Sequence, residues 1–288
     1  METTLSIPEL RRLATEVRKD ALRSITAAGS GHPGGSLSAA DIMTALYFRC
    51  ANLPSPTDPD RDRIFWSKGH IAPLLYTLLA YKGFFPKEEL MTLRRFGSRL
   101  QGHPKKGSPP GVETSTGSLG QGLSVAVGCA YAARYDRLPV RSYCLTGDGE
   151  LQEGQIWEAL MAGAHFQLDN LCAIIDNNGL QIDGKCSEVM CIDDVGARLR
   201  AFNWHVISID GHDMGQCVDA LEEAKTVKGR PTAIVAHTIK GKGVSFMENV
   251  AGWHGKAPTQ AELEQALAEL DARQQSLQAA AHCLRHVG

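Results

Sequence analysis

The most informative stretch of the sequence is VRSYCLTGDGELQEGQIWEALMAGAHFQLDNLCAIIDNNGL, residues 140–180. An apolar run over 140–146 predicts a buried strand, and apolar residues at helical spacing over 153–166 predict a helix. Leu171–Ile175 predicts a second buried strand. Together they form a β-α-β unit, whose two strands lie parallel. The carboxyl ends of both strands therefore reach the same edge of the sheet, where open α/β sheets bind ligands.

Polar residues follow both of these strands. Asp148 comes directly after the first strand, and Asn178 follows the second, thirty residues later. The Asp148 carboxylate, the Asn178 amide oxygen and the Leu180 carbonyl offer three hard oxygens, and Mg²⁺ fills its remaining positions with phosphate oxygens and water. Gly149 lets a diphosphate approach the backbone, and the helix after it offers unpaired N–H groups. Two ordinary turns are the alternative, but their place after successive strands favours a metal–diphosphate site.

The same motif carries a resemblance to a known family. A Gly-Asp-Gly at 147–149 followed by Asn178 resembles the signature of thiamine-diphosphate enzymes. Five further motifs resemble those of the transketolase family, in that family's order: Ser30–Gly35, Ser67–His70, Gly102–Pro104, Thr116–Gly122 and Trp253–Gly255. The resemblance runs from about Glu9 to Pro258. A full-length transketolase is far longer, so the chain resembles the diphosphate-binding half alone, as in split, two-subunit transketolases.

Four histidines are the catalytic candidates. His32, His70, His103 and His254 each adjoin Gly or Pro in a predicted loop, and loop positions carry function more often than helix faces do. The resemblance implies that they surround the reactive end of the cofactor, orient the sugar hydroxyls and help to move protons. It also implies that His70 and His254 touch the diphosphate. An imidazole suits these tasks because its pKa lies near neutral pH.

The resemblance implies further contacts to the cofactor and its metal. The backbone of Gly117, Ser118 and Leu119 would pass beside the aminopyrimidine ring. Lys240 follows a predicted strand and can reach the same sheet edge, although an ordinary exposed lysine is an equal alternative. Glu153 matches a family glutamate near the subunit interface, or it is an acid that favours a helix N-terminus. The implied cofactor-binding set is His70, Gly117, Ser118, Leu119, Gly149, Glu153, Asn178, Lys240 and His254. The metal is Mg²⁺, with Ca²⁺ or Mn²⁺ as alternatives, on Asp148, Asn178 and Leu180.

The rest of the chain repeats the alternation of strand and helix, which predicts an α/β fold: a doubly wound, mainly parallel sheet with helices on both faces. Residues 1–288 are expected to form a single diphosphate-binding domain, with a peripheral helix over 261–286. The other expected strands are 63–66, 204–209 and 232–238. The other expected helices start at the capping box of Ser6 and cover 39–47, 74–81, 120–134 and 216–226.

The activity implied by the resemblance is transfer of a two-carbon ketol (glycolaldehyde) unit from a ketose phosphate to an aldose phosphate, as in the pentose phosphate pathway. In this family a glutamate on the aminopyrimidine comes from a separate pyrimidine-binding domain. About 34 residues follow His254, too few for such a domain. We therefore expect a C-terminal partner subunit, an α2β2 heterotetramer, and an active site between the two kinds of chain.

Other interpretations stay open at this point. The chain could belong to another thiamine-dependent enzyme, similar to deoxyxylulose-phosphate synthase or a 2-oxo acid dehydrogenase, or it could be a non-catalytic homologue. The histidine motifs and the intact Asp148 and Asn178 speak against these alternatives. Residues 34–38, Gly-Gly-Ser-Leu-Ser, replace a more usual Gly-Ala-Pro-Leu-Gly run. This change leaves the donor and acceptor sugars open, modified sugars included.

Composition excludes several function classes. A net charge of −2 and a pI near 6.6 give no electrostatic reason to expect a nucleic acid or an anionic membrane as partner. The sequence has no apolar run of roughly 20 residues and no signal-peptide core. Eight scattered cysteines without a Cys-x-x-Cys pair are typical of reduced thiols. A cytoplasmic location follows as the expectation.

Overall fold

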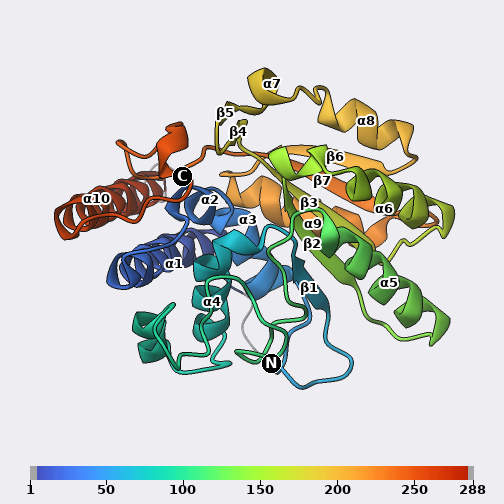
Figure 1. The fold of residues 1–288 in the computed structure, drawn as a ribbon, viewed down its shortest axis with the longest axis horizontal. Helices are drawn as coiled ribbons and strands as arrows, with labels where there is room; N and C mark the ends of the chain where they lie inside the picture. Colours follow the sequence, from blue (N-terminus) through green and yellow to red (C-terminus); the bar gives the residue numbers. More distant parts are fainter. Residues whose placement is uncertain (1–4, 285–288) are drawn as a thin grey trace.

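A five-stranded parallel sheet forms the centre of the computed structural model, which describes the backbone of residues 5–284 and the side chains of residues 5–276 (Figure 1). The strand order is β1-β2-β3-β7-β6, and each neighbouring pair is parallel. The strands are β1 (Arg63–Trp66), β2 (Ser142–Gly147), β3 (Leu171–Asn177), β6 (His205–Asp210) and β7 (Thr232–His237). The predicted parallel fold class is confirmed.

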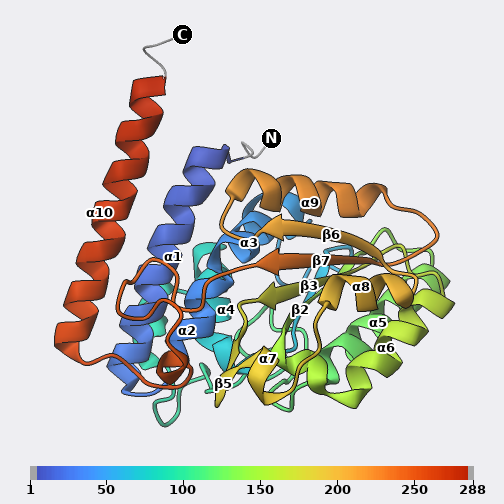
Figure 2. The same cartoon turned by 90° about the horizontal axis from the view of Figure 1, so that it is seen from above.

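Helices cover both faces of this sheet, as Figure 2 shows. One layer contains α1 (Ile7–Ala28), α3 (Ala40–Ala45), α4 (Ala72–Tyr81) and α9 (Met214–Thr226); the other contains α5 (Gln121–Tyr135), α6 (Gly154–His165) and α8 (Val195–Ala201). Side chains alternate between the layers along each strand: Cys172 and Ile174 pack with the first, Ala173 and Ile175 with the second. Burial on both faces explains why the sequences of these strands are continuous apolar runs.

Several elements were not expected from the sequence. Helix α2 (Pro33–Ser38) forms within the Gly-rich motif after His32, with Pro33 in its first turn and all six residues buried. Tertiary packing thus outweighs the low helix propensity of its two glycines. The predicted helix over 39–47 is α3 followed by a π-helical turn at Leu46–Cys50. A hairpin of β4 (Leu180–Gln181) and β5 (Gly184–Lys185) and a short helix, α7 (Cys186–Val189), follow β3.

The C-terminal helix α10 (Gln260–Leu284) lies beside α1, away from the sheet (Figure 2). The predicted helix over 261–286 starts within one residue of the observed start of α10 at Gln260. Residues 285–286 of the predicted range lie outside the part of the chain that the structure describes. Leu263, Ala266 and Leu270 are buried against Leu22 and Met247, so the first half of α10 belongs to a packed cluster. Within the described residues, no helix combines the length and the apolar character that crossing a membrane requires.

Candidate active site

A cavity of about 320 Å³ lies where four of the five strands end. The loops after β1, β2, β3 and β7 all contribute side chains to it, because parallel strands bring their carboxyl ends to one edge. Eleven of the residues singled out from the sequence line this cavity: His32, His70, His103, Gly117, Leu119, Asp148, Gly149, Asn178, Leu180, Lys240 and His254. Segments up to about 220 residues apart in the chain thus meet in one place.

Two of the predicted residues do not line the cavity. Ser118 is exposed, between Gly117 and Leu119, which do line it. Glu153 is exposed at the N-cap of α6, so the helix begins one residue later than predicted. A Cβ built on Gly120 would lie 2.7 Å from the Glu153 Cβ, which places this side chain directly against the loop that carries Gly117. Contacts of Ser118 and Glu153 with the cofactor stay predictions.

The three expected metal ligands face one part of this cavity. Asp148 is buried, and its carboxylate accepts hydrogen bonds from the N–H groups of Gly149 and Gly179. The Asn178 Oδ1 accepts from the Leu180 N–H at 3.1 Å, which turns the chain after β3 back towards Asp148. Burial, and then the neighbouring Asp176, raise the pKa of Asp148. A divalent cation would relieve this buried negative charge, so the oxygen donors present fit a hard cation.

Among the described residues, no group of three or more His, Cys, Asp or Glu side chains gathers to hold a metal. The candidate set contains a single carboxylate, so a cation here depends on oxygens from a ligand such as a diphosphate. The wall of the cavity is tight at Gly149, where a Cβ would lie 3.1 Å from the Gln181 side chain, and both residues line the space that such a ligand would fill. Gln181 Nε2 is buried without a partner among the described residues, as expected for a donor whose partner is a ligand.

Lys240 is 2% exposed, which rules out the alternative of an ordinary surface lysine. Its ammonium donates to the Leu180 carbonyl at 3.1 Å and to His254 Nδ1 at 2.9 Å. Burial, and then the charge of Lys68, lower the pKa of Lys240 to about 8. A buried ammonium beside a candidate metal ligand is suited to bind the same anionic group as the metal does.

Lys68 and Asp176 were missed by sequence reasoning. Lys68 lines the cavity and forms a buried ion pair with Asp176 of β3. The Asp176 carboxylate also accepts hydrogen bonds from the hydroxyls of Ser38 and Thr238. Burial opposes ionisation of Asp176, but the Lys68 ammonium outweighs it and lowers the pKa. An aspartate after two isoleucines in an otherwise apolar strand was the signal that could have identified this network.

Glu150 was also missed, and it ties three loops of the cavity together. Its carboxylate accepts hydrogen bonds from the Ser67 hydroxyl, from the Gly120 N–H at 2.9 Å and from the Gly147 N–H at 3.0 Å. Ser67 Oγ in turn accepts from the Gly122 N–H at 3.0 Å. The loops that carry His70, Leu119 and Asp148 are therefore held by one buried side chain.

The four predicted histidines form one cluster. The ring centroid of His32 lies 5.1 Å from that of His70, 5.4 Å from that of His254 and 6.4 Å from that of His103. Burial is the main cause that lowers the pKa of each of them, to about 4 for His32 and about 3 for His254. Neighbouring cations, among them Arg94 beside His32 and His103, add to the effect. At neutral pH the cluster therefore consists of neutral imidazoles, each able to donate and accept a hydrogen bond.

Comparison with known proteins assigns the family of this chain. The family model described as "Transketolase, thiamine diphosphate binding domain" matches residues 10–282. The chain belongs to the transketolase family. It carries the thiamine-diphosphate-binding domain of that family, as the resemblance of its motifs implies.

Two relatives of similar length are named as subunits. The chain is 45% identical over 265 residues to the 6-deoxy-6-sulfo-D-fructose transketolase subunit SqwG of Clostridium sp. (strain MSTE9), covering 91% of this chain and 96% of that protein. It is 41% identical over 276 residues to one of the subunits of the apulose-4-phosphate transketolase of Phocaeicola vulgatus, covering 95% of this chain and 98% of that protein.

The transketolase from Leishmania mexicana has a similar structure, with a TM-score of 0.82 and 29% identity over 98% of this chain. The chain spans 46% of that longer transketolase.

The partly buried His32 of this transketolase domain predicts how stability depends on pH. The pKa of His32 is about 4 in the folded chain against an ordinary value of 6.5, so the unfolded chain binds more protons between these values. Stability without cofactor is therefore expected to be fully present above about pH 6.5 and to fall as the pH drops towards 4. The urea midpoint, measured at pH 7, 6 and 5, checks this. His32→Gln should flatten the dependence, whereas His165→Gln, on α6 outside the cavity, should not. Equal slopes in all three chains would contradict the prediction.

Proposed function

We propose that this chain is the cofactor-binding subunit of a two-subunit transketolase, which moves a two-carbon ketol unit from a ketose phosphate to an aldose phosphate. The observation that carries the proposal is the convergence of three features on one cavity. These features are the oxygen donors of Asp148, Asn178 and Leu180, the buried ammonium groups of Lys68 and Lys240, and the histidine cluster. The first two suit a metal diphosphate, and the third suits a polyhydroxylated substrate.

Asp148, Asn178 and the Leu180 carbonyl would hold Mg²⁺, or Ca²⁺ or Mn²⁺ in its place, against the diphosphate. Lys240 would bind the same diphosphate beside the metal, because its ammonium lies 3.1 Å from the Leu180 carbonyl. The Gly149 backbone would approach the same group, with no side chain in the way. Gly117 and Leu119 line the cavity on the side that would receive the aminopyrimidine ring. This arrangement places opposite charges around the anion in a buried setting, where such contacts are strong.

Thiamine diphosphate, when bound, supplies the thiazolium ring that takes up the electrons of the carbon–carbon bond broken in the ketose. The histidines of this chain would bind the sugar hydroxyls and carry protons. His254 Nδ1 accepts a hydrogen bond from Lys240, so its proton sits on Nε2, which is left as a donor. His32 Nδ1 is buried and has no hydrogen-bond partner among the described residues, so it is available to a substrate. Both imidazoles are uncharged at neutral pH, so His254 offers a bound substrate a donor at Nε2 and His32 offers it a free nitrogen at Nδ1.

The partner in this proposal is a C-terminal transketolase subunit with the pyrimidine-binding domain. Two relatives that this chain covers nearly end to end are named as transketolase subunits, which supports a divided enzyme. The carboxylates that line the cavity are Asp148, Glu150 and Asp183. Asp148 is the proposed metal ligand, and the Glu150 carboxylate already accepts hydrogen bonds from two backbone N–H groups. The glutamate for the aminopyrimidine would therefore come from the partner, and the active site would lie between the two chains.

We propose an α2β2 heterotetramer in which two copies of this chain also meet. Helices α5 and α6 lie side by side and present exposed apolar side chains. Tyr131 and Phe166 form one surface, with ring centroids 4.8 Å apart, and Val125, Tyr135 and Met161 extend it. Tyr135 is 79% exposed. An apolar surface of this kind on neighbouring helices is typical of a contact between chains, and Glu153 lies at the start of α6, next to the cavity loop.

The cytoplasm is the proposed location. All seven cysteines with described side chains are free thiols, and five of them are buried. Burial raises the pKa of thiols such as Cys172, to about 12, so these groups stay protonated and unreactive. Free thiols of this kind are typical of a reducing compartment. The near-neutral net charge gives no reason to propose a nucleic acid or a membrane as a further partner.

The identity of the donor and acceptor sugars is a question for experiment. The structure shows which contacts the unusual residues 34–38 make. Ser38, which replaces the usual Gly, is fully buried and donates its hydroxyl to Asp176 at 2.6 Å. Its effect therefore falls on the buried ion pair and not on a sugar. Gly35 lines the cavity, where a Cβ would lie 2.8 Å from Ile71. Because two relatives are named for modified sugars, we propose that ordinary pentose phosphates and modified ketoses are both candidate donors.

Mixing this chain with its genomic neighbour tests the proposed function. The mixture is expected to transfer a ketol unit from at least one ketose phosphate, and each chain alone should show no turnover. The assay panel should contain ordinary and sulfonated or branched ketoses, with light scattering to measure the mass of the complex. Fast turnover by this chain alone would contradict the shared active site. A folded, cofactor-binding mixture that transfers no ketol unit from any donor would favour the non-catalytic alternative, and an altered reaction would favour another thiamine-dependent enzyme.

A further inference from the structure

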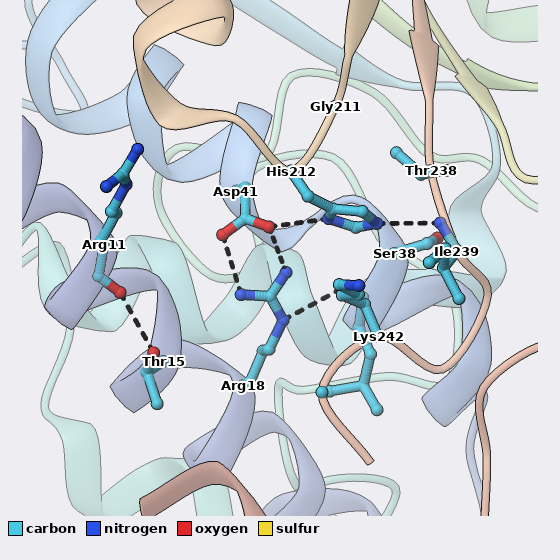
Figure 3. Close-up of polar contacts among 12 residues, drawn as sticks. Arg11, Thr15, Arg18, Ser38, Asp41, Gly211, His212, Thr238, Ile239 and Lys242 are labelled. Carbon is cyan, nitrogen blue, oxygen red and sulfur yellow. Dashed lines mark hydrogen bonds and ion pairs between the residues drawn. The ribbon is translucent and has the colours of Figure 1, made fainter. Parts of the chain in front are cut away.

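His212 lies outside the cavity, at the end of the fifth strand, β6, and connects two distant parts of the fold (Figure 3). On one side its Nδ1 lies 2.8 Å from Asp41 Oδ2 of α3. On the other side its Nε2 accepts the Ile239 N–H, in the loop after β7, at 2.8 Å. A backbone N–H can only donate, so Nε2 carries no proton and the proton sits on Nδ1. His212 is therefore a neutral bridge with a defined tautomer.

The Asp41 end of this bridge is rigid. Arg18 of α1 forms two hydrogen bonds to the Asp41 carboxylate, at 2.9 and 2.6 Å, and donates its Nε to the Leu37 carbonyl at 3.1 Å. Burial opposes ionisation of Asp41, but Arg18 and His212 outweigh it and lower its pKa. The Asp41 side chain is 11% exposed and that of His212 is 7% exposed. A two-pronged guanidinium–carboxylate pair in this setting holds the histidine in one orientation.

The Ile239 end leads directly into the active site. Ile239 precedes Lys240, whose ammonium lies at the Leu180 carbonyl and at His254. The backbone on the other side of Lys240 is tied by the Gly241 N–H, which donates to the Gly34 carbonyl at 2.9 Å. The Asn249 N–H donates to the Lys240 carbonyl at 2.9 Å, and the Lys242 N–H donates to the Ile239 carbonyl at 3.2 Å. Among these hydrogen bonds to the 239–241 backbone, the one from the Ile239 N–H is accepted by a side chain, that of His212. Figure 3 shows this side chain between Asp41 and Ile239.

We propose that His212 is a positioning residue for Lys240: by accepting the Ile239 N–H, it sets the place at which the lysine ammonium meets the diphosphate. The inference rests on the proposed role of Lys240. Without the acceptor, the partly buried Ile239 N–H loses its partner and the loop can take another position. His212 itself does not line the cavity, so its effect on the cofactor is indirect, and the contact that brings it next to Lys240 is the hydrogen bond from the Ile239 N–H.

Two replacements of His212 separate its two hydrogen bonds. Gln places an amide oxygen near the position of Nε2, so it can still accept the Ile239 N–H. Asn reaches only the position of Nδ1, so it can still donate to Asp41 but leaves the Ile239 N–H without a partner. His212 lines a second cavity of about 470 Å³, which leaves room for either side chain. The matched control is His205→Asn, since His205 pairs with a carboxylate, Glu223, at 2.7 Å and does not touch the loop.

The measurement is calorimetric titration of thiamine diphosphate with Mg²⁺ into this chain together with its partner subunit, with the melting temperature recorded without cofactor. His212→Asn is expected to weaken binding about tenfold, from the loss of the partly buried hydrogen bond that the Ile239 N–H donates. His212→Gln and the His205→Asn control should stay within about twofold of the unchanged protein. A Gln variant that folds but binds about tenfold weaker would overturn the proposal. So would an Asn variant that binds normally.

A double-mutant cycle distinguishes positioning from general structural damage. Lys240→Met alone should weaken binding about tenfold or more, and adding His212→Asn to it should cost less than about twofold further. Additive losses would overturn the role of His212 and leave that of Lys240 standing. Unchanged binding in Lys240→Met would overturn the proposed role of Lys240, and the inference with it.

Discussion

Asp148→Ala is expected to abolish the metal-dependent binding of thiamine diphosphate, with a loss of at least about 100-fold in affinity. Asp148 is the one carboxylate in the candidate metal set, beside the neutral oxygens of Asn178 and Leu180. Its removal leaves a divalent cation without a charged protein ligand in a buried cavity. Calorimetry with Mg²⁺ and thiamine diphosphate, on this chain with its partner subunit, measures the effect.

Asp148→Asn is the matched control for folding. The amide oxygen can still accept the Gly179 N–H, whereas the Gly149 N–H loses its acceptor, so the turn keeps one of its two hydrogen bonds while the charge is lost. Because burial and Asp176 already disfavour the charged form of Asp148, removal of the charge offsets this loss, and the cofactor-free variant should be about as stable as the original chain. Its melting temperature should no longer rise when Mg²⁺ and cofactor are added. Unchanged cofactor affinity in either variant would remove the metal assignment.

Asp176→Leu is expected to destabilise the cofactor-free chain by about 3–5 kcal/mol, because it leaves the Lys68 ammonium buried without its partner. The hydroxyls of Ser38 and Thr238 lose their acceptor at the same time. Urea unfolding of the cofactor-free chain measures this change. Lys185→Met is the surface control, since both side chains of the Lys185–Glu188 pair are 65% exposed. This substitution should change the free energy of unfolding by less than about 0.5 kcal/mol.

The double variant, Lys68→Met with Asp176→Leu, separates folding from binding. Removing both charges eliminates the unpaired ammonium, so the double variant should be more stable than Asp176→Leu alone. Cofactor affinity should not recover, because Lys68 lines the cavity and supplies one of its two ammonium groups. Recovery of both stability and affinity would mean that Lys68 serves only to neutralise Asp176.

Most of the sheet was predictable from local patterns. The limits expected for the first strand, 63–66, agree with β1 at both ends, because the apolar run is bounded by charged residues and by Ser67. Asp148 and Asn178 meet in the structure because β2 and β3 are parallel neighbours, which their spacing already required. Residues that directly follow parallel strands are therefore predictable members of a site, since topology alone brings them together.

Other parts of the site depended on contacts between distant segments. Helix α2 forms in a Gly-rich stretch because the surrounding elements bury it. Its two glycines made a loop the better prediction from the sequence, although Pro33 is compatible with a helix start. Glu150 follows Asp148 and Gly149 in a 3-10 turn, and its carboxylate accepts N–H groups from two different loops, which no local pattern indicates. The sequence allowed Lys240 to be either a site residue or an exposed surface lysine. Its burial in the folded chain distinguishes the two.

The family, the parallel sheet and the edge at which the site forms all follow from periodicity and from motifs at strand ends. Which charges pair follows instead from the packing of the folded chain. Lys68 meets Asp176 across 108 residues, and Asp41 meets His212 across 171. The reason is physical: a buried charge needs a partner in space, and the packing of whole layers, rather than any spacing along the chain, determines which residue that partner is.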